Sequence, residues 1–227
     1  MPSDSPLRPR LLKGALVSFP SHFLGPVPNV IVFQYNPDQL SRTLADRRPQ
    51  PQQATEERGS AREEAYVVTG PPVETINITV DLDAADQLSE PAFHPHTVQF
   101  GIHPALAALE MLLYPPESQR VKIELLSGQG GAQLASANLP LTLFVWGKSR
   151  VVPVRVTSFS VTEQAFDQQL NPIRAKVTLG MRVLTSDDLL DSSLGRDVYN
   201  AYQSQKEVLA RLNLASSVEK LTSMLPF

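Results

Sequence analysis

Residues 173–183 read IRAKVTLGMRV, and this stretch decides the fold class. Apolar side chains occupy every second position, and the polar set between them includes Arg174, Lys176 and Arg182. A period of two places the two sets on opposite faces of an extended strand. The stretch therefore predicts a β-strand with one buried face and one polar face.

Residues 75–82 repeat this pattern, with apolar positions alternating with polar ones that include Asn77 and Asp81. Weaker strand signals occur at residues 14–19, 29–34, 120–126, 139–146 and 151–162. In the last of these the apolar positions change parity near Thr157, which predicts a β-bulge. The expected fold class is mainly β, of the α+β kind.

Helical periodicity occurs in two places. One helix is expected to begin at His103-Pro104, to bury its leucines against the sheet and to end at the prolines 115 and 116. Beyond residue 186 the pattern favours short helices, because Ser216 and Glu219 form a capping-box pattern that would begin a new one. We expect one domain over residues 1–186 and a helical extension over residues 187–227.

Two segments are poor in apolar residues. Residues 1–10 are rich in proline, and residues 45–65 read ADRRPQPQQATEERGSAREEA. Such a composition buries too little surface to offset the entropy of ordering. We expect a loose N-terminus and a long mobile loop inserted into the domain.

Composition excludes several function classes. The 227 residues include no cysteine, which excludes disulfides and thiolate chemistry. The formal net charge of −3 does not favour nucleic acid as a partner. The sequence shows no signal peptide and no apolar stretch long enough for a membrane helix, so we expect synthesis in the cytosol and no membrane insertion.

The search for catalytic chemistry finds little. His94, His96 and His103 lie within ten residues and could hold a metal, but Pro95 favours a loop with exposed imidazoles. The glycine-rich run at residues 127–131 lacks the Lys-Ser/Thr of a P-loop and predicts a hairpin turn. The basic strand face lacks the interleaved aromatic residues of a nucleic-acid surface. We expect no enzyme activity, no metal and no cofactor.

Several spaced elements resemble the contractile injection system tube protein family, found in phage-tail-like particles. The resemblance spans about residues 15–184. It covers an opening FQYNPDQLSR element, a strand that ends in Trp-Gly, and a hairpin where asparagine 171 could take the left-handed turn position of a glycine. The matching residues are Phe33, Asn36, Pro37, Leu40, Trp146, Gly147, Phe166, Pro172, Arg174 and Ala175.

The resemblance implies a phage-tail-tube-like fold, with two packed β-sheets or a flattened barrel and one helix. It also implies a hexameric ring that joins a spike hub to an inner tube within a baseplate, so that the particle could carry the chain outside the cell. Many members of the family end in a LysM-type module, which this chain lacks. The lumen or interface candidates are Asn77, Asp81, Trp146, Arg174, Lys176 and Arg182, and the hub or baseplate contacts are expected at residues 45–65 and in the C-terminal helices.

Three alternatives remain open at this point. A small-ligand β-barrel should contain a deep apolar pocket in a monomer. A hydrolase or metal enzyme would use the three clustered histidines. A terminator or another tube-like ring would share the structural role at a different position in the particle.

Overall fold

The computed structural model describes residues 12–19, 28–47, 68, 70–115, 139–191 and 193–224. Seven strands form one antiparallel sheet in the order β2-β1-β5-β6-β7-β4-β3. The strands are β1 (Ala15–Phe19), β2 (Asn29–Val32), β3 (Leu40–Ala45), β4 (Val73–Asp83), β5 (Leu141–Val145), β6 (Val151–Phe166) and β7 (Pro172–Val183). The predicted fold class, mainly β with a few helices, is confirmed.

The helices lie in two regions of the sequence. Between β4 and β5 come α1 (Ala85–Ser89), α2 (Pro95–Phe100), α3 (His103–Glu110) and the 3-10 turn η2 (Met111–Leu113). After β7 come the 3-10 turn η3 (Ser186–Asp188) and α5 (Leu194–Met224). The expected start of α3 at His103 is confirmed, whereas α1, α2 and the edge strand β3 were not expected from the sequence.

Strands β7 and β4 form the centre of the long part of the sheet. They pair over nine residue pairs, from Thr75–Arg182 to Asp83–Arg174. The apolar set of β7 is buried, whereas Arg174 and Lys176 are exposed. The period-two reading of both segments is therefore confirmed, and each strand places one face on the core.

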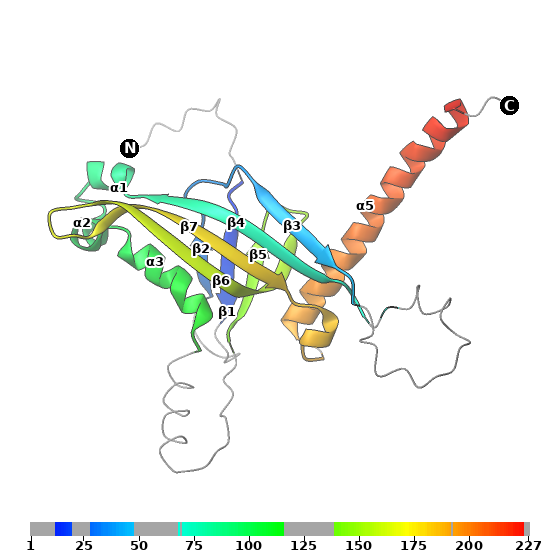
Figure 1. Cartoon of the computed structure of the whole chain (residues 1–227), viewed down its shortest axis with the longest axis horizontal. Coiled ribbons are helices and arrows are strands. Elements are labelled where there is room, and N and C mark those ends of the chain that lie inside the picture. The colour runs from blue at the N-terminus through cyan, green and yellow to red at the C-terminus, as the bar shows by residue number, and fades with distance from the viewer. Residues whose placement is uncertain are drawn as a thin grey trace, which may run out of the picture.

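Strand β6 connects the two parts of the sheet. Its first residues pair with β5, and from Val154 onward it pairs with β7. The register shifts between Val156 and Ser158, so the predicted bulge is confirmed. A bulge bends and twists its strand. In Figure 1 the short strands β1, β2 and β5 accordingly cross behind the long strands.

The connection from β2 to β3 joins the two outer strands of the sheet. It consists of residues 33–39 alone, which can span at most about 25 Å. The sheet must therefore curl until its ends lie close together. One continuous curled sheet replaces the two separate sheets that the resemblance allowed, and it has the shape of an open, flattened barrel.

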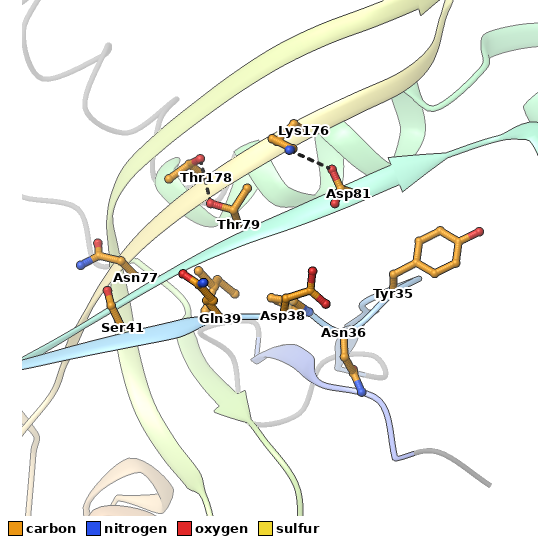
Figure 2. Close-up of a pocket in the computed structure, with 12 residues that line it drawn as sticks. Tyr35, Asn36, Asp38, Gln39, Ser41, Asn77, Thr79, Asp81, Lys176 and Thr178 are labelled. Atoms are coloured by element: carbon orange, nitrogen blue, oxygen red, sulfur yellow. Dashed lines mark hydrogen bonds and ion pairs between the residues drawn. The ribbon is translucent and has the colours of Figure 1, made fainter. Parts of the chain in front are cut away.

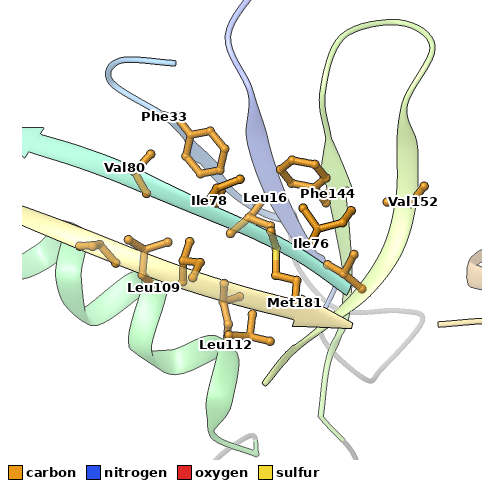
Figure 3. Packing of buried hydrophobic residues seen from close by; sticks show 14 of the residues in the cluster. Leu16, Phe33, Ile76, Ile78, Val80, Leu109, Leu112, Phe144, Val152 and Met181 are labelled. Carbon is orange, nitrogen blue, oxygen red and sulfur yellow. The ribbon is translucent and has the colours of Figure 1, made fainter. Parts of the chain in front are cut away.

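The space inside this curl is filled by apolar side chains. Leu16 of β1 and Phe144 of β5 pack with Ile76, Val80 and Met181 of the long strands, all almost fully buried. Helix α3 adds leucines 106 and 109 to the same cluster, followed by leucine 112 (Figure 3). Burial of each such side chain contributes about 1.5–3 kcal/mol, so this cluster is the main stabilising feature of the domain.

The C-terminal extension is one helix rather than several short ones. Helix α5 has 31 residues, corresponding to about 46 Å of axis. No glycine or proline interrupts it after Gly195, so the capping-box pattern at Ser216 and Glu219 does not start a new helix. Tyr199 and Tyr202 are buried near its start, and in Figure 1 its later turns project away from the sheet.

Other sequence expectations lie outside the described residues. These are the loose N-terminus at residues 1–10, most of the loop at 45–65, the strand at 120–126 and the turn at 127–131.

Candidate subunit interface

The outward face of β3, β4, β7 and β6 is a continuous polar surface. Residues directly opposite each other in the register share a face, so the polar side chains form rows across the four strands. The rows are Ser41–Asn77–Gly180–Ser158, Thr79–Thr178–Ser160 and Asp81–Lys176–Thr162. Hydroxyl and amide groups dominate these rows, and the side chains of Thr79 and Thr178 contact each other at 3.2 Å.

A shallow groove of about 450 Å³ lies on this polar face (Figure 2). One side is formed by the segment Tyr35 to Ser41, and the other by β4 and β7. Asn77, Asp81 and Lys176, all expected at an interface or lumen, line this groove. The sheet thus brings three of the predicted residues together.

The three cations predicted on this face are all paired with carboxylates of the same chain. Arg174 contacts Asp83 at 2.6 Å, and Lys176 lies 3.9 Å from Asp81 on the neighbouring strand. Arg182 contacts Asp188 of η3 at 2.8 Å. These three side chains are therefore paired charges rather than a free basic stripe.

Two of these carboxylates have lowered pKa values. The Ala85 backbone N–H donates to Asp83, and together with Arg174 it holds the pKa of that carboxyl below its ordinary value. Burial alone would raise the pKa of Asp188, but hydrogen bonds from Thr185 and the charge of Arg182 outweigh burial and lower it. Both carboxylates are thus held in the charged form that their cations require.

Both ends of the four-stranded part have open backbone edges. Among the described residues, strand β3 pairs with β4 alone. Strand β6 pairs with β5 only over Val151–Val154, so within the described part of the chain its residues 155–166 pair with β7 alone. An open edge presents N–H and C=O groups that another strand can satisfy. These two edges are the main candidate contact sites.

The motif at residues 33–37 holds the curl of the sheet together. The Gln34 amide donates to the Asp83 carbonyl at 2.6 Å and accepts from the Asp83 N–H at 2.9 Å. The Asn36 amide bonds in the same two-way manner to the backbone of Leu12 and Gly14. Of the motif residues, Phe33 is buried and Pro37 is half-buried. The segment thus ties the start of β1 to the end of β4, a role of Gln34 that sequence reasoning missed.

Trp146 and Gly147 form a packed corner. The Trp146 ring stacks on Phe144 with centroids 5.8 Å apart. It also closes over Gly14, where an added Cβ would lie 2.7 Å from the indole. Gly147 has a φ of 74°, which turns the chain toward β6. In the isolated subunit Trp146 is therefore part of the packing, and its predicted contact to another copy stays a prediction.

The hairpin between β6 and β7 is stabilised by Asp167. Its carboxylate accepts hydrogen bonds from Gln169 and Asn171, and the Asn171 side-chain amide contributes most to lowering its pKa. The left-handed residue of this turn is Leu170, with φ 65°, and not Asn171 as expected. A left-handed leucine costs about 1–2 kcal/mol.

The other hairpin residues of the motif divide by position. Phe166 is exposed at the end of β6, whereas Pro172 is buried and its carbonyl accepts a hydrogen bond from Ile102. Ala175 is fully buried in the core. At the opposite edge, Leu40 packs partly against the core.

A buried carboxylate anchors α5 to the sheet. Glu74 of β4 is 4% exposed and contacts Arg42 of β3 at 2.9 Å and Lys206 of α5 at 3.0 Å. Tyr202 lies 3.3 Å from the same carboxylate, and the Lys206 ammonium lies 4.1 Å from the Tyr202 ring centroid. Sequence reasoning missed this network, because Tyr202 and Lys206 lie 128 and 132 residues from Glu74 along the chain.

The histidines do not form a site with the acidic residues near them. His96 and His103 are exposed, and His94 precedes the first turn of α2. Among the described residues no group of three His, Cys, Asp or Glu side chains could hold a metal ion. None of the described helices is both long and apolar enough to cross a bilayer.

No protein-family model matches the sequence, and no curated protein matches it.

Proposed function

We propose that this chain is a structural subunit that closes into a ring by strand addition between copies, and that the ring is the tube initiator or adaptor of a contractile injection system. The observation that carries the proposal is the four-stranded sheet β6-β7-β4-β3, which within the described part of the chain is open at both edges and is polar on one face. The core lies on its other face. No reactive side chain is needed for this function.

Strand direction supports a head-to-tail contact. Because all four strands are antiparallel to their neighbours, β6 and β3 run in opposite directions. A copy rotated about a ring axis presents its β6 in the same direction as the first copy. The β3 of one copy therefore meets the β6 of the next copy antiparallel. Such a contact repeats and can close into a ring.

The resemblance to the tube proteins supplies the number of copies. Six copies with four strands each would form a barrel of 24 strands. A barrel of this size encloses a wide lumen. The rows of Thr79, Thr178 and their polar neighbours would face that lumen, while the apolar core stays on the outside. Hydroxyls and paired charges suit a wet channel wall.

The projecting part of α5 supports a role in joining components. Val208, Leu209 and Leu212 on this part are each more than half exposed. The early turns of the helix are fixed to β4 by Glu74, so the later turns hold a defined direction. We assign α5 to contacts with the spike hub, the inner tube protein or other baseplate components.

Engineered disulfides test the ring contact in the full chain, which has no cysteine of its own. Thr43→Cys on β3 and Ser160→Cys on β6 both place a thiol on the polar face. Within one chain these strands are three strand spacings apart, about 14 Å, whereas a disulfide needs Cα atoms within about 7 Å. Any bond between the two positions must therefore join two copies.

The matched control is Thr79→Cys with Thr178→Cys, which lie on paired strands and should close within one chain. We expect the pair Thr43→Cys and Ser160→Cys to give a ladder of covalent oligomers that ends at a closed ring. Cysteines at Ser41, Ser158 and Thr162 test the neighbouring strand registers in the same way. Monomers only, with the control pair fully oxidised, would overturn the proposal.

A further inference from the structure

The far end of the long strands carries a patch of exposed apolar side chains. Here α2 and the β6–β7 turn meet, as Figure 1 shows, and the Asn171 side chain donates to the Gln99 carbonyl at 3.2 Å. We call this set the tip patch. Its members are Phe93 (79% exposed), Val98 (46%), Phe100 (43%), Phe166 (49%) and Leu170 (77%).

The backbone at Leu170 is in an unfavourable conformation for a leucine. Its φ of 65° is a conformation that glycine or asparagine adopts more easily. Its side chain is mostly in solvent and contributes little to the core. A strained and exposed leucine at a hairpin turn points to a contact outside the subunit.

The surroundings of the tip patch are acidic. Residues 84–102 and 162–173 contain Asp86, Glu90, Glu163 and Asp167, and no lysine or arginine. Glu163 is exposed, and its side chain has no ion pair among the described residues. A surface that covers the tip patch should therefore be apolar with a free positive charge at its rim.

Such a surface lies at the opposite end of the same chain. A groove of about 540 Å³, which we call the base groove, is formed where β5, β6 and the start of α5 meet. Its apolar lining includes Leu112, Pro140, Leu141, Leu184, Leu189 and Leu190. Leu190 is 83% exposed, so this end is also incompletely covered in the described part of the subunit.

The charge at the rim of the base groove is complementary to that of the tip patch. Arg155 lines the groove, is exposed, and makes no side-chain ion pair within the described residues. The acidic residue there, Asp188, is already bound by Arg182 and Thr185 of its own chain. The unpaired charge of the groove is therefore positive.

We infer that the tip patch of one copy docks into the base groove of a second copy, with Leu170 inserted among the groove leucines and Glu163 facing Arg155. The two surfaces cannot meet within one chain, because the 12 residues of β7 separate them by about 40 Å. The contact is head-to-tail, like the strand addition of the proposed function, on which this inference rests for the presence of a second copy. It adds a second joint between copies.

The test uses Leu170→Cys and Leu190→Cys in the full cysteine-free chain. After mild oxidation, a mixture of the two single variants should give dimers that contain one chain of each kind, and the double variant should give a ladder. Neither single variant should cross-link alone. Leu170→Cys mixed with Leu212→Cys, at an α5 position that is 63% exposed, is the control and should stay monomeric.

Two further variants separate docking from folding. Leu170→Gly should lower the fraction of complexes in which the tip patch of one copy is docked in the base groove of another about tenfold. Its thermal midpoint should stay unchanged or rise, because glycine accepts the positive φ. Arg155→Glu should weaken docking, and adding Glu163→Arg should restore it. Dimers of Leu170→Cys alone, or no mixed dimers at all, would overturn the inference.

The outcome is distinguishable from that of the strand-addition test. A ladder from Thr43→Cys and Ser160→Cys without mixed dimers of Leu170→Cys and Leu190→Cys would support the ring and refute the tip contact. Mixed dimers without a ladder would support the tip contact and refute the pairing of sheet edges.

Discussion

Gly101 offers a sharp test of how the helices are fixed to the hairpin. It joins α2 to α3 with φ 58° and ψ −133°, a region that side chains rarely enter. A Cβ at this position would fall well inside van der Waals contact with the Pro172 carbonyl oxygen. That oxygen belongs to β7 and accepts the Ile102 N–H at 2.9 Å. Because it is backbone, it cannot rotate away.

The cost of Gly101→Ala follows from these contacts. The unfavourable φ contributes about 1–2 kcal/mol, and displacement of the Ile102–Pro172 hydrogen bond contributes about 1 kcal/mol more. The total is about 2–3 kcal/mol, which lowers the thermal midpoint of a domain of this size by about 4–12 °C. Thermal unfolding followed by circular dichroism measures the shift.

Gly147→Ala is the matched control for this prediction. Gly147 also has a positive φ, 74°, but no atom lies within 4 Å of the position of an added Cβ. Its cost should be the backbone strain alone, about 1–2 kcal/mol or about 2–8 °C. Equal shifts for the two variants, or a shift below about 2 °C for Gly101→Ala, would refute the steric reasoning.

Three other predictions concern ion pairs and packing. Glu74→Ala should lower the free energy of unfolding by about 1–3 kcal/mol and speed hydrogen exchange in the early turns of α5, because it leaves two partly exposed cations unpaired. The lowered pKa values of Asp83 and Asp188 stabilise the fold at pH values above their unfolded pKa of about 4. The denaturant midpoint should therefore fall as the pH is lowered through about 4 and below. Gly14→Ala should cost about 1–3 kcal/mol in chemical denaturation and cost less in a Trp146→Phe background, where the ring that it strikes is smaller.

Local pattern was sufficient to predict the long strands. The alternation in β4 and β7 shows which face is buried without any knowledge of the partner strand. The parity change near Thr157 located the bulge for the same reason. The edge strand β3 was missed because its core-side position 42 holds arginine, whose partner Glu74 is known only once β3 and β4 are paired.

The candidate site was only partly predictable. The polar face follows from alternation, but the ion pairs of Arg174 and Lys176 depend on the register with β4. The backbone clamps of Gln34 and Asn36 join segments 49 and 22–24 residues apart, which no local motif shows. The choice of Leu170 over Asn171 for the left-handed position opposes intrinsic preference, so propensity alone predicted it wrongly.

Amide hydrogen exchange of the assembled full chain tests the central claim most directly. If copies join through their sheet edges, the outward N–H groups of Leu40–Ala45 and of residues 155–166 should exchange at least tenfold more slowly in the assembly than in dilute monomer. Central amides of β4 and β7 should be protected in both states. Edge amides that exchange at the same rate in an assembled particle as in the monomer would contradict strand addition.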